Sequence, residues 1–163
     1  MSIVLAQIIS KIMNWSIKKT HLAKVSKFKG ISKSANIGIG CILNLPVNNL
    51  VIGKNTYLNQ VHLNSGNNSK IIIGEGCALG YNVSIKAITH SKEKPTNNEE
   101  GGIIHIEKDI VIGDNCWIGD NVFIREGVVL GNNVIVGANS VVTKSFDSNI
   151  ILAGVPAKII STL

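Results

Sequence analysis

The chain has 163 residues, of which 45% are hydrophobic and only 4% aromatic, and its formal net charge is +6 at pH 7. This length accommodates one compact domain and leaves no room for a second. The three cysteines form no CxxC pair, so the sequence indicates neither a zinc motif nor a complete set of disulfides. The lysines are scattered without an aromatic-basic stripe, so we expect no nucleic-acid partner.

Residues 1–24 form the first predicted segment, an N-terminal helix. Apolar side chains recur at helical spacing within residues 2–19, at Leu5, Ile8, Ile9, Ile12 and Met13. We expect this helix to cap the domain that follows it. The alternative is peripheral contact with an anionic membrane, because the apolar face is followed by Lys18, Lys19, Lys24, Lys27 and Lys29.

The same segment does not have the pattern of a membrane-spanning helix or of a signal peptide. Its apolar run is short and is interrupted by Gln7, Lys11 and Asn14. No charged stretch precedes the apolar residues, as a signal peptide requires. We therefore expect a cytoplasmic protein, with the inner face of the membrane as the alternative location.

Residues 25–146 are dominated by an apolar residue at every sixth position. The clearest run is Ile106, Ile112, Ile118, Ile124, Leu130, Val136 and Val142. An α-helix repeats its apolar face every 3.6 residues and a strand every 2, so neither explains this period. Three flat faces of six residues close into a triangular coil of about eighteen residues, and roughly six such coils fit here. The pattern predicts an all-β solenoid, with a short C-terminal segment at residues 147–163.

Smaller inward residues and turn residues support this prediction. The positions two residues before each ladder member are smaller on average, as at Cys116 and Ser140. Cys77 and Cys116 fall at this inward position, so we expect them to fill the core. Asn, Asp and Gly in IGDN and LGNN tolerate left-handed backbone at the corners. The register also runs through Ile52, Leu58, Ile73, Leu79 and Ile85, whereas residues 31–51 are irregular and Cys41 cannot be placed.

The repeat is interrupted by a polar insertion, which we expect to be an extruded loop at about residues 86–103. His90 stands where the chain leaves the coils, and a neutral imidazole at such an edge can accept a proton from a bound hydroxyl. His105 alternates with Ile104 and Ile106, which we expect to point inward. We therefore expect His105 to point outward, with a solvent or interface role.

Two lysines lie where the regular coils end. Lys144 and Lys158 are candidates to bind a small ligand that carries phosphate groups, and solvated surface is the alternative for each.

The stretch from IGDNCWIGD to AGVPAKII resembles the hexapeptide-repeat acyltransferases. It is similar to the branch of sugar and antibiotic O-acetyltransferases that includes the galactoside, maltose and streptogramin enzymes. The motifs WIG, GANSVVTK and AGVPAK carry the resemblance, which covers about residues 51–160. The resemblance implies a left-handed parallel β-helix, a homotrimer, and an acetyl-CoA site in the cleft between neighbouring prisms.

The resemblance also implies roles for individual residues. His90 matches the catalytic histidine, and Tyr57 and Asn59 match residues of the acceptor site. Trp117 matches the aromatic residue beside the cleft. The alternatives are that Asn59 is a turn residue and that Trp117 packs in an ordinary turn. The acetyl-CoA side corresponds to Gly119, Ala138, Thr143 and Lys144, with Lys158 reaching the nucleotide phosphates. After AGVPAK some relatives carry a further basic residue, which this chain lacks.

The predicted reaction is direct transfer of an acetyl group to a hydroxyl. His90 takes the hydroxyl proton, backbone N–H groups from Trp117 to Gly119 stabilise the oxyanion, and neither a metal nor an acyl-enzyme is needed. The leading acceptor is a sugar hydroxyl of a polysaccharide or glycolipid, followed by an antibiotic hydroxyl and an amino-sugar nitrogen. Two other classes stay open: a zinc-dependent γ-type carbonic anhydrase using His62, His90 and His105, and a non-catalytic β-helix scaffold.

Overall fold

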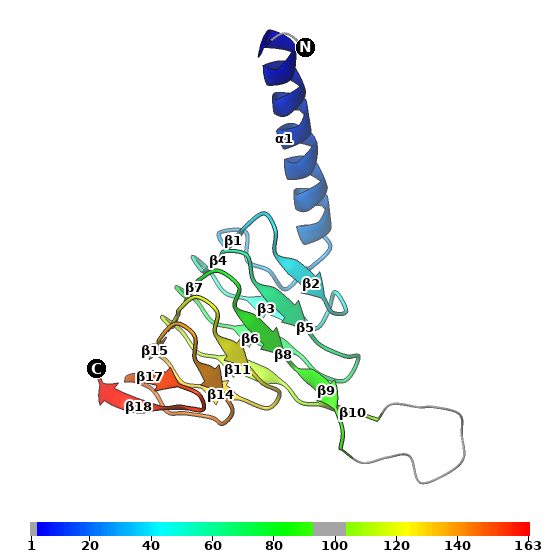
Figure 1. Cartoon of the computed structure of the whole chain (residues 1–163). Coiled ribbons are helices and arrows are strands. Elements are labelled where there is room, and N and C mark those ends of the chain that lie inside the picture. The colour runs from blue at the N-terminus through cyan, green and yellow to red at the C-terminus, as the bar shows by residue number, and fades with distance from the viewer. Residues whose placement is uncertain (1–2, 93–103) are drawn as a thin grey trace.

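The computed structural model describes residues 3–92 and 104–163. Its body is a triangular stack of coils built from three parallel sheets, and helix α1 (Ile3–Val25) projects from the end of the stack where the chain begins (Figure 1). Three parallel sheets of this kind are typical of a left-handed β-helix. The structure therefore confirms the predicted fold class.

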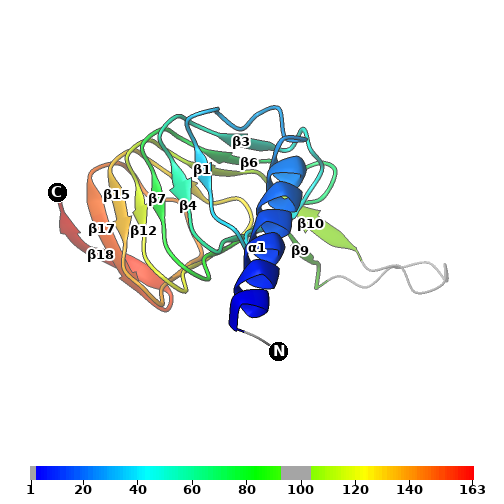
Figure 2. The same ribbon diagram turned by 90° about the horizontal axis from the view of Figure 1, so that it is seen from above.

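Each coil contributes one short strand to each of three sheets, which we call A, B and C (Figure 2). Sheet A contains β3 (Leu50–Ile52), β6 (Ile71–Ile73), β11 (Ile110–Ile112) and β14 (Val129–Leu130). Sheet B contains β1 (Asn36–Ile37), β4 (Tyr57–Leu58), β7 (Ala78–Leu79), β12 (Trp117–Ile118), β15 (Val134–Val136), β17 (Ile150–Gly154) and β18 (Ala157–Thr162). Sheet C contains β2 (Ile42–Asn44), β5 (His62–Asn64), β8 (Ser84–Lys86), β13 (Phe123–Ile124) and β16 (Val141–Val142).

The interior is filled by the predicted six-residue ladder. Every ladder member from Ile112 to Val142 is buried, as are the small residues two positions before them. The earlier members Ile52, Leu58, Ile73, Leu79 and Ile85 are buried as well. Because parallel strands place residues of the same register directly above one another, each face contributes a continuous aliphatic column to one core.

Asparagine side chains line a corner of the prism in a second ladder. Asn82, Asn121 and Asn139 adopt positive φ of 56°, 58° and 61°; left-handed backbone was predicted for Asn121, which belongs to an IGDN motif. The amide nitrogen of Asn82 donates to the side-chain oxygen of Asn121 at 3.2 Å, and Asn121 donates to Asn139 at 3.1 Å. The corner between sheets B and C is therefore hydrogen-bonded from coil to coil.

A two-stranded hairpin leaves the stack at the corner between sheets C and A. It consists of β9 (Ile88–His90) and β10 (His105–Glu107), which pair antiparallel. The chain leaves the coils after Lys86, which still belongs to β8, although the loop was predicted to begin at about residue 86. Residues 93–103 of the predicted loop lie outside the described residues. Ile104 and Ile106 were wrongly expected to point inward: Ile104 is exposed and Ile106 only half-buried, because both belong to the hairpin and not to a coil.

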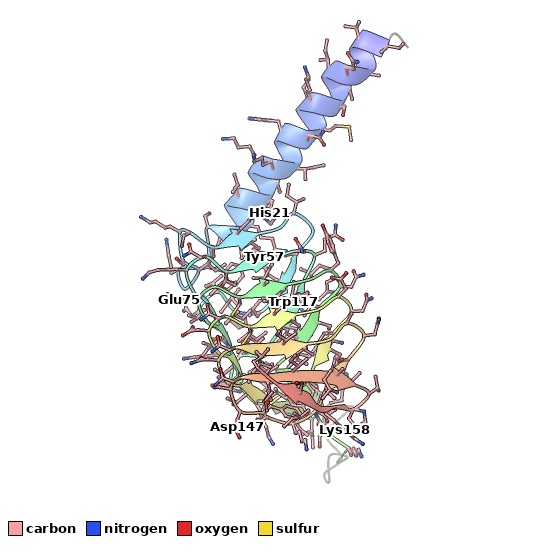
Figure 3. All side chains as sticks on the ribbon, turned by 90° about the vertical axis from the view of Figure 1, so that its left-hand side faces the viewer. His21, Tyr57, Glu75, Trp117, Asp147 and Lys158 are labelled. Atoms are coloured by element: carbon pink, nitrogen blue, oxygen red, sulfur yellow. The ribbon has the colours of Figure 1, made fainter. Side chains whose placement is uncertain are left out.

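The prediction that α1 caps the stack with its apolar face is wrong. No residue of α1 is buried, and the helix stands away from the coils (Figures 1 and 3). Contact is made at its C-terminal end, where His21 Nε2 donates to the carbonyl oxygen of Ile37 at 2.7 Å. The first coil is closed by Phe28, which follows the helix and is buried. Among the described residues, no helix is long and apolar enough to cross a membrane.

The C-terminal segment continues the solenoid. Strand β17 pairs parallel with β15, and β18 folds back antiparallel onto β17 after a cis peptide bond between Val155 and Pro156. Residues 147–163 therefore extend sheet B by two strands.

All three cysteines are buried and free. Cys77 and Cys116 occupy the predicted inward positions, and Cys41, which the sequence could not place, also faces the core. Burial raises the pKa of the Cys41 thiol. These thiols therefore fill core volume, as predicted for two of them.

Candidate active site

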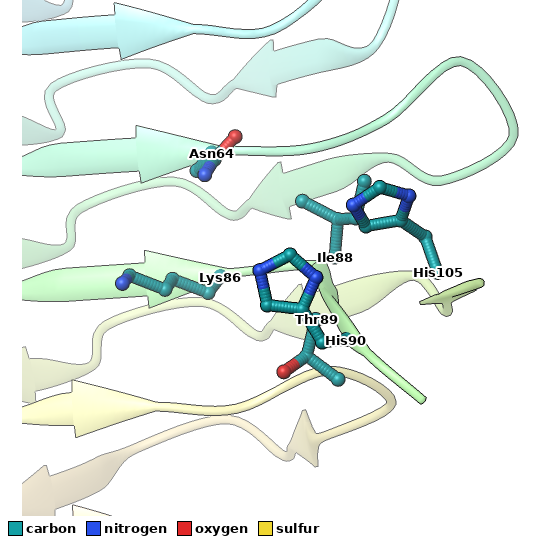
Figure 4. Close-up of a pocket in the computed structure, with 6 residues that line it drawn as sticks. All are labelled: Asn64, Lys86, Ile88, Thr89, His90 and His105. Atoms are coloured by element: carbon teal, nitrogen blue, oxygen red, sulfur yellow. The ribbon is translucent and has the colours of Figure 1, made fainter. Parts of the chain in front are cut away.

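A pocket of about 250 Å³ opens at the base of the hairpin (Figure 4). Asn64 at the end of β5 and Lys86 at the end of β8 lie side by side in sheet C and form one wall. The other lining residues are Ile88, Thr89, His90 and His105 of the hairpin. The pocket thus combines one cation, one amide and two imidazoles at a corner of the prism.

The two histidines of this pocket face each other across the hairpin. His90 is the last residue of β9, not a loop residue as predicted, and it pairs in register with His105 of β10. Their ring centroids lie 5.0 Å apart with an interplanar angle of 38°, and both side chains are exposed. His105 therefore points outward as predicted, but it lies in the same pocket as His90.

Hydrogen bonds hold the hairpin base against the coils. The carboxylate of Glu107 accepts the backbone N–H of Asn68 at 2.6 Å. The backbone N–H of Lys108 donates to Ala87 at 3.0 Å, and that of Ser91 donates to Ile104 at 2.7 Å. Both imidazoles thus lie on an element that is fixed at its base, as the positioning of a catalytic base requires.

A second pocket, of about 330 Å³, lies on sheet B at the corner that leads to sheet C. It brings together three of the predicted residues, Trp117, Gly119 and Ala138, and it is also lined by Asp120, Ile135, Val136 and Gly137. Trp117 is 58% exposed and presents its ring to solvent. A Cβ atom at position 119 would lie 2.7 Å from the backbone nitrogen of Ala138, so only glycine fits there.

One part of the predicted mechanism does not agree with this geometry. The N–H of Gly119 was expected to stabilise the oxyanion, but it donates to the carbonyl oxygen of Val136 at 2.8 Å. This hydrogen bond belongs to the ladder between coils, so the N–H is not free to bind a substrate.

The remaining predicted residues lie outside the histidine pocket and the Trp117 pocket. Tyr57 shares the outward row of sheet B with Trp117, with Ala78 between them, about 10 Å apart on the usual strand spacing (Figure 3). Asn59 follows Tyr57 and is half-buried, and its backbone N–H donates to Leu79 at 3.1 Å.

Thr143 and the two predicted phosphate-binding lysines lie near the C-terminal end of the stack and are exposed. Thr143 and Lys144 follow β16 at the corner between sheets C and A, and the Lys144 ammonium lies 5.4 Å from the centre of the Phe146 ring. Lys158 lies on β18.

The two pockets lie on different sides of one prism. The chain crosses the whole of sheet C between them, and the hairpin projects away from sheet B (Figures 1 and 2). The seven residues from Gly80 to Lys86 span at most about 20 Å, the length of six fully extended steps. The histidine pocket and the Trp117 pocket are therefore two separate pockets within a single chain. Within residues 3–92 and 104–163, no group of three histidine, cysteine, aspartate or glutamate side chains is placed to hold a metal ion.

Comparison with known proteins finds similarity to one family of transferases. Residues 109–144 match the family described as "Bacterial transferase hexapeptide (six repeats)". A protein of Dictyostelium discoideum named "Putative acetyltransferase" is 41% identical over 117 residues, which cover 71% of this chain and 58% of that protein. The chain thus spans little more than half the length of this relative.

Solved structures give the same result. A hexapeptide-repeat acetyltransferase of Vibrio cholerae, in complex with acetyl-CoA, is 27% identical with a TM-score of 0.69, covering 90% of this chain and 78% of its own. A galactoside acetyltransferase in complex with CoA is 29% identical with a TM-score of 0.62, covering 79% and 64%. A maltose O-acetyltransferase of Clostridium difficile is 27% identical with a TM-score of 0.62, covering 85% and 72%. The chain is therefore similar to the hexapeptide-repeat acetyltransferases in both sequence and fold.

Proposed function

We propose that the protein transfers an acetyl group from acetyl-CoA to a hydroxyl of a sugar, in a polysaccharide, a glycolipid or one of their precursors. The observation that carries this proposal is the exposed His90 in a polar pocket at the prism corner. The similarity of the chain to an acetyltransferase solved with acetyl-CoA supports the donor, and its similarity to a galactoside and a maltose acetyltransferase supports the class of acceptor.

Acetyl-CoA is assigned to the pocket of Trp117, Gly119 and Ala138. Its lining is mainly small or apolar, which suits the pantetheine arm, and Gly119 lets a ligand approach the backbone closely. Thr143, Lys144 and Lys158 are assigned to the polar end of the cofactor, because exposed ammonium groups attract phosphate.

We propose that the histidine pocket and the Trp117 pocket are two half-sites of one active site, which a homotrimer unites. One chain keeps its His90 pocket and its Trp117 pocket on different sides, so a single copy does not place a proton acceptor beside the bound thioester. In a ring of three copies, each interface joins two different surfaces of neighbouring chains. We assign the histidine corner to one surface and the Trp117 pocket to the other, which gives one complete site per interface.

The proposed reaction is a direct transfer in the ternary complex. His90 accepts the proton of the acceptor hydroxyl as its oxygen attacks the acetyl carbonyl carbon. The tetrahedral intermediate collapses by breaking the bond from carbon to sulfur, and the CoA thiolate takes the proton back from His90. His105 is assigned a positioning role, since its ring restricts the orientation of the His90 imidazole.

The proposal is tested by CoA release, measured by thiol detection, from acetyl-CoA and a panel of free sugars, nucleotide sugars, oligosaccharides and hydroxylated antibiotics. His90→Ala should lower turnover by about 10²-fold or more while CoA binding persists. His62→Ala is the matched control, since this exposed histidine lies in β5 outside both pockets. A fully active His90→Ala variant would remove His90 from the mechanism. A wild-type protein that binds no CoA would favour a non-catalytic scaffold.

A further inference from the structure

Helix α1 carries the largest cluster of exposed apolar side chains in the described chain. Ile3 is 77% exposed, Trp15 is 63% exposed, and no residue of the helix is buried. The polar positions Gln7, Lys11, Asn14 and Lys18 follow the i, i+4, i+7 spacing of one helical strip. The apolar side chains of residues 3–17 are spread over the remaining arc, together with Ser10 and Ser16, and this arc is wider than the two-position seam of a coiled coil.

The charge around the base of this helix has one sign. Residues 1–74 contain nine of the chain's sixteen lysine and arginine residues, whereas all ten aspartate and glutamate residues come later, the first being Glu75. Exposed lysines lie along the second half of α1 and just after it, at Lys18, Lys19, Lys24, Lys27, Lys29 and Lys33. The end of the stack from which α1 projects is therefore cationic, with no carboxylate side chain from residues 1–74 to neutralise it.

We propose that α1 and these lysines bind the surface of an anionic phospholipid bilayer and hold the coil stack against it. The helix combines many exposed apolar side chains with a cationic base, which is complementary to the surface of an anionic bilayer. The apolar side chains would be buried at the boundary with the acyl chains, and the ammonium groups would bind the anionic headgroups. Residues 3–17 extend about 22 Å at 1.5 Å per residue, which is shorter than the hydrocarbon core, so the helix lies in one leaflet and does not span the bilayer.

The same charges disfavour a second copy of α1 as the occupant of this face. Lys19 lies one turn after Trp15, on the apolar side of the helix, so parallel packing of identical helices through that side would bring the Lys19 side chains of the copies together. No acidic residue within residues 1–74 is available to pair with them. Interhelical contacts in coiled coils are ordinarily supported by opposite charges beside the seam, and α1 has none.

The first test is co-sedimentation of the full chain with vesicles. Binding to phosphatidylcholine mixed with phosphatidylglycerol should exceed binding to phosphatidylcholine alone, and it should fall as salt is raised. Equal binding to both vesicle types, or no binding to either, would overturn the proposal. The assay requires neither acetyl-CoA nor turnover, so its result is independent of the proposed acetyltransferase activity.

Matched charge variants test the cationic base. Lys18→Glu combined with Lys19→Glu should weaken vesicle binding by about 30-fold or more, since each lysine near the surface contributes about fivefold. Lys54→Glu combined with Lys70→Glu makes the same change of charge on exposed residues of the coils and should have a much smaller effect. Equal losses in the two variants would indicate nonspecific attraction and overturn the assignment to α1.

Apolar variants and fluorescence test the helix face. Ile8→Asp combined with Ile12→Asp should abolish binding, whereas Ile160→Asp, on the exposed face of β18, should not. In a Trp117→Phe background Trp15 is the remaining tryptophan, so its emission should shift to shorter wavelength with anionic vesicles. If Ile8→Asp with Ile12→Asp instead reduced the oligomeric mass in solution and left vesicle binding unchanged, α1 would be an interface between copies and the proposal would fail.

Discussion

Mixing two inactive variants tests whether the active site is shared between chains. His90→Ala removes the proposed base and leaves the Trp117 pocket intact. Ala138→Trp fills that pocket and leaves the hairpin intact, and the exposed position of Ala138 accommodates the larger side chain without disturbing the core. Each variant alone should be inactive, because every interface of its homotrimer lacks one half-site.

The size of the expected recovery follows from the separation of the half-sites. In a ring of three, an active interface needs the His90 corner of one Ala138→Trp chain beside the pocket of a His90→Ala chain. Every mixed trimer contains one such interface among its three, whichever variant is in the majority. Random mixing of equal amounts should therefore restore about one quarter of wild-type activity.

The assay is CoA release by the mixed sample after the two variants are unfolded together and refolded, with native mass spectrometry to establish that mixed trimers are present. Each variant refolded alone is the control, and CoA binding should persist in His90→Ala and be lost in Ala138→Trp. Mixed trimers without activity would refute the shared site and require both half-sites to act within one chain.

Two further predictions concern the core. Ile112→Ala should lower the free energy of unfolding by about 2–5 kcal/mol, because it leaves a cavity in a fully buried column. Val129→Ala, on the outward face of the same sheet, should change the free energy of unfolding by less than about 0.5 kcal/mol. Urea denaturation measures both, and equal effects would contradict the assigned register. Cys41 should react slowly with iodoacetamide in the folded protein at neutral pH, because burial raises its pKa and leaves little thiolate. The rate of labelling should rise with pH or on unfolding. Mass spectrometry after a timed quench measures this rate, and rapid labelling of the folded protein would show that the thiol is accessible.

The fold could be predicted because the six-residue period is a direct consequence of the triangular coil. Ile118, Ile124 and Leu130 each belong to a different face, and all three are buried as the period requires. The same argument failed at Ile106, which keeps the spacing of six but belongs to the hairpin. Over three residues, the alternation of a hairpin strand cannot be distinguished from that of a coil face.

The role of the N-terminal helix could not be read from its sequence. Apolar spacing predicted the helix, which extends from Ile3 to Val25. It did not identify what covers the apolar face, because that depends on surfaces outside the helix itself. The capping role was wrong for this reason, and Phe28 closes the first coil instead.

The site was predicted only in part. His90 was identified from the resemblance and from its place beside the insertion, whereas the proximity of His105 was missed. A signal was present, because the two histidines flank the polar insertion and an antiparallel hairpin would pair them. The division of Trp117 and His90 between two sides of the prism depends on how the coils stack, which residue spacing alone does not reveal.

The hairpin is inserted without breaking the pairing of the coils on either side of it. Strand β6 pairs directly with β11, and β8 pairs with β13, although residues 87–109 intervene. The stability of stacked coils depends mainly on contacts between neighbours, so the inserted segment costs little more than loop-closure entropy, which grows only slowly with length. The segment next to the proposed base can therefore change in length and sequence while the scaffold keeps its free energy, which leaves acceptor choice free to diverge between relatives that share the same core.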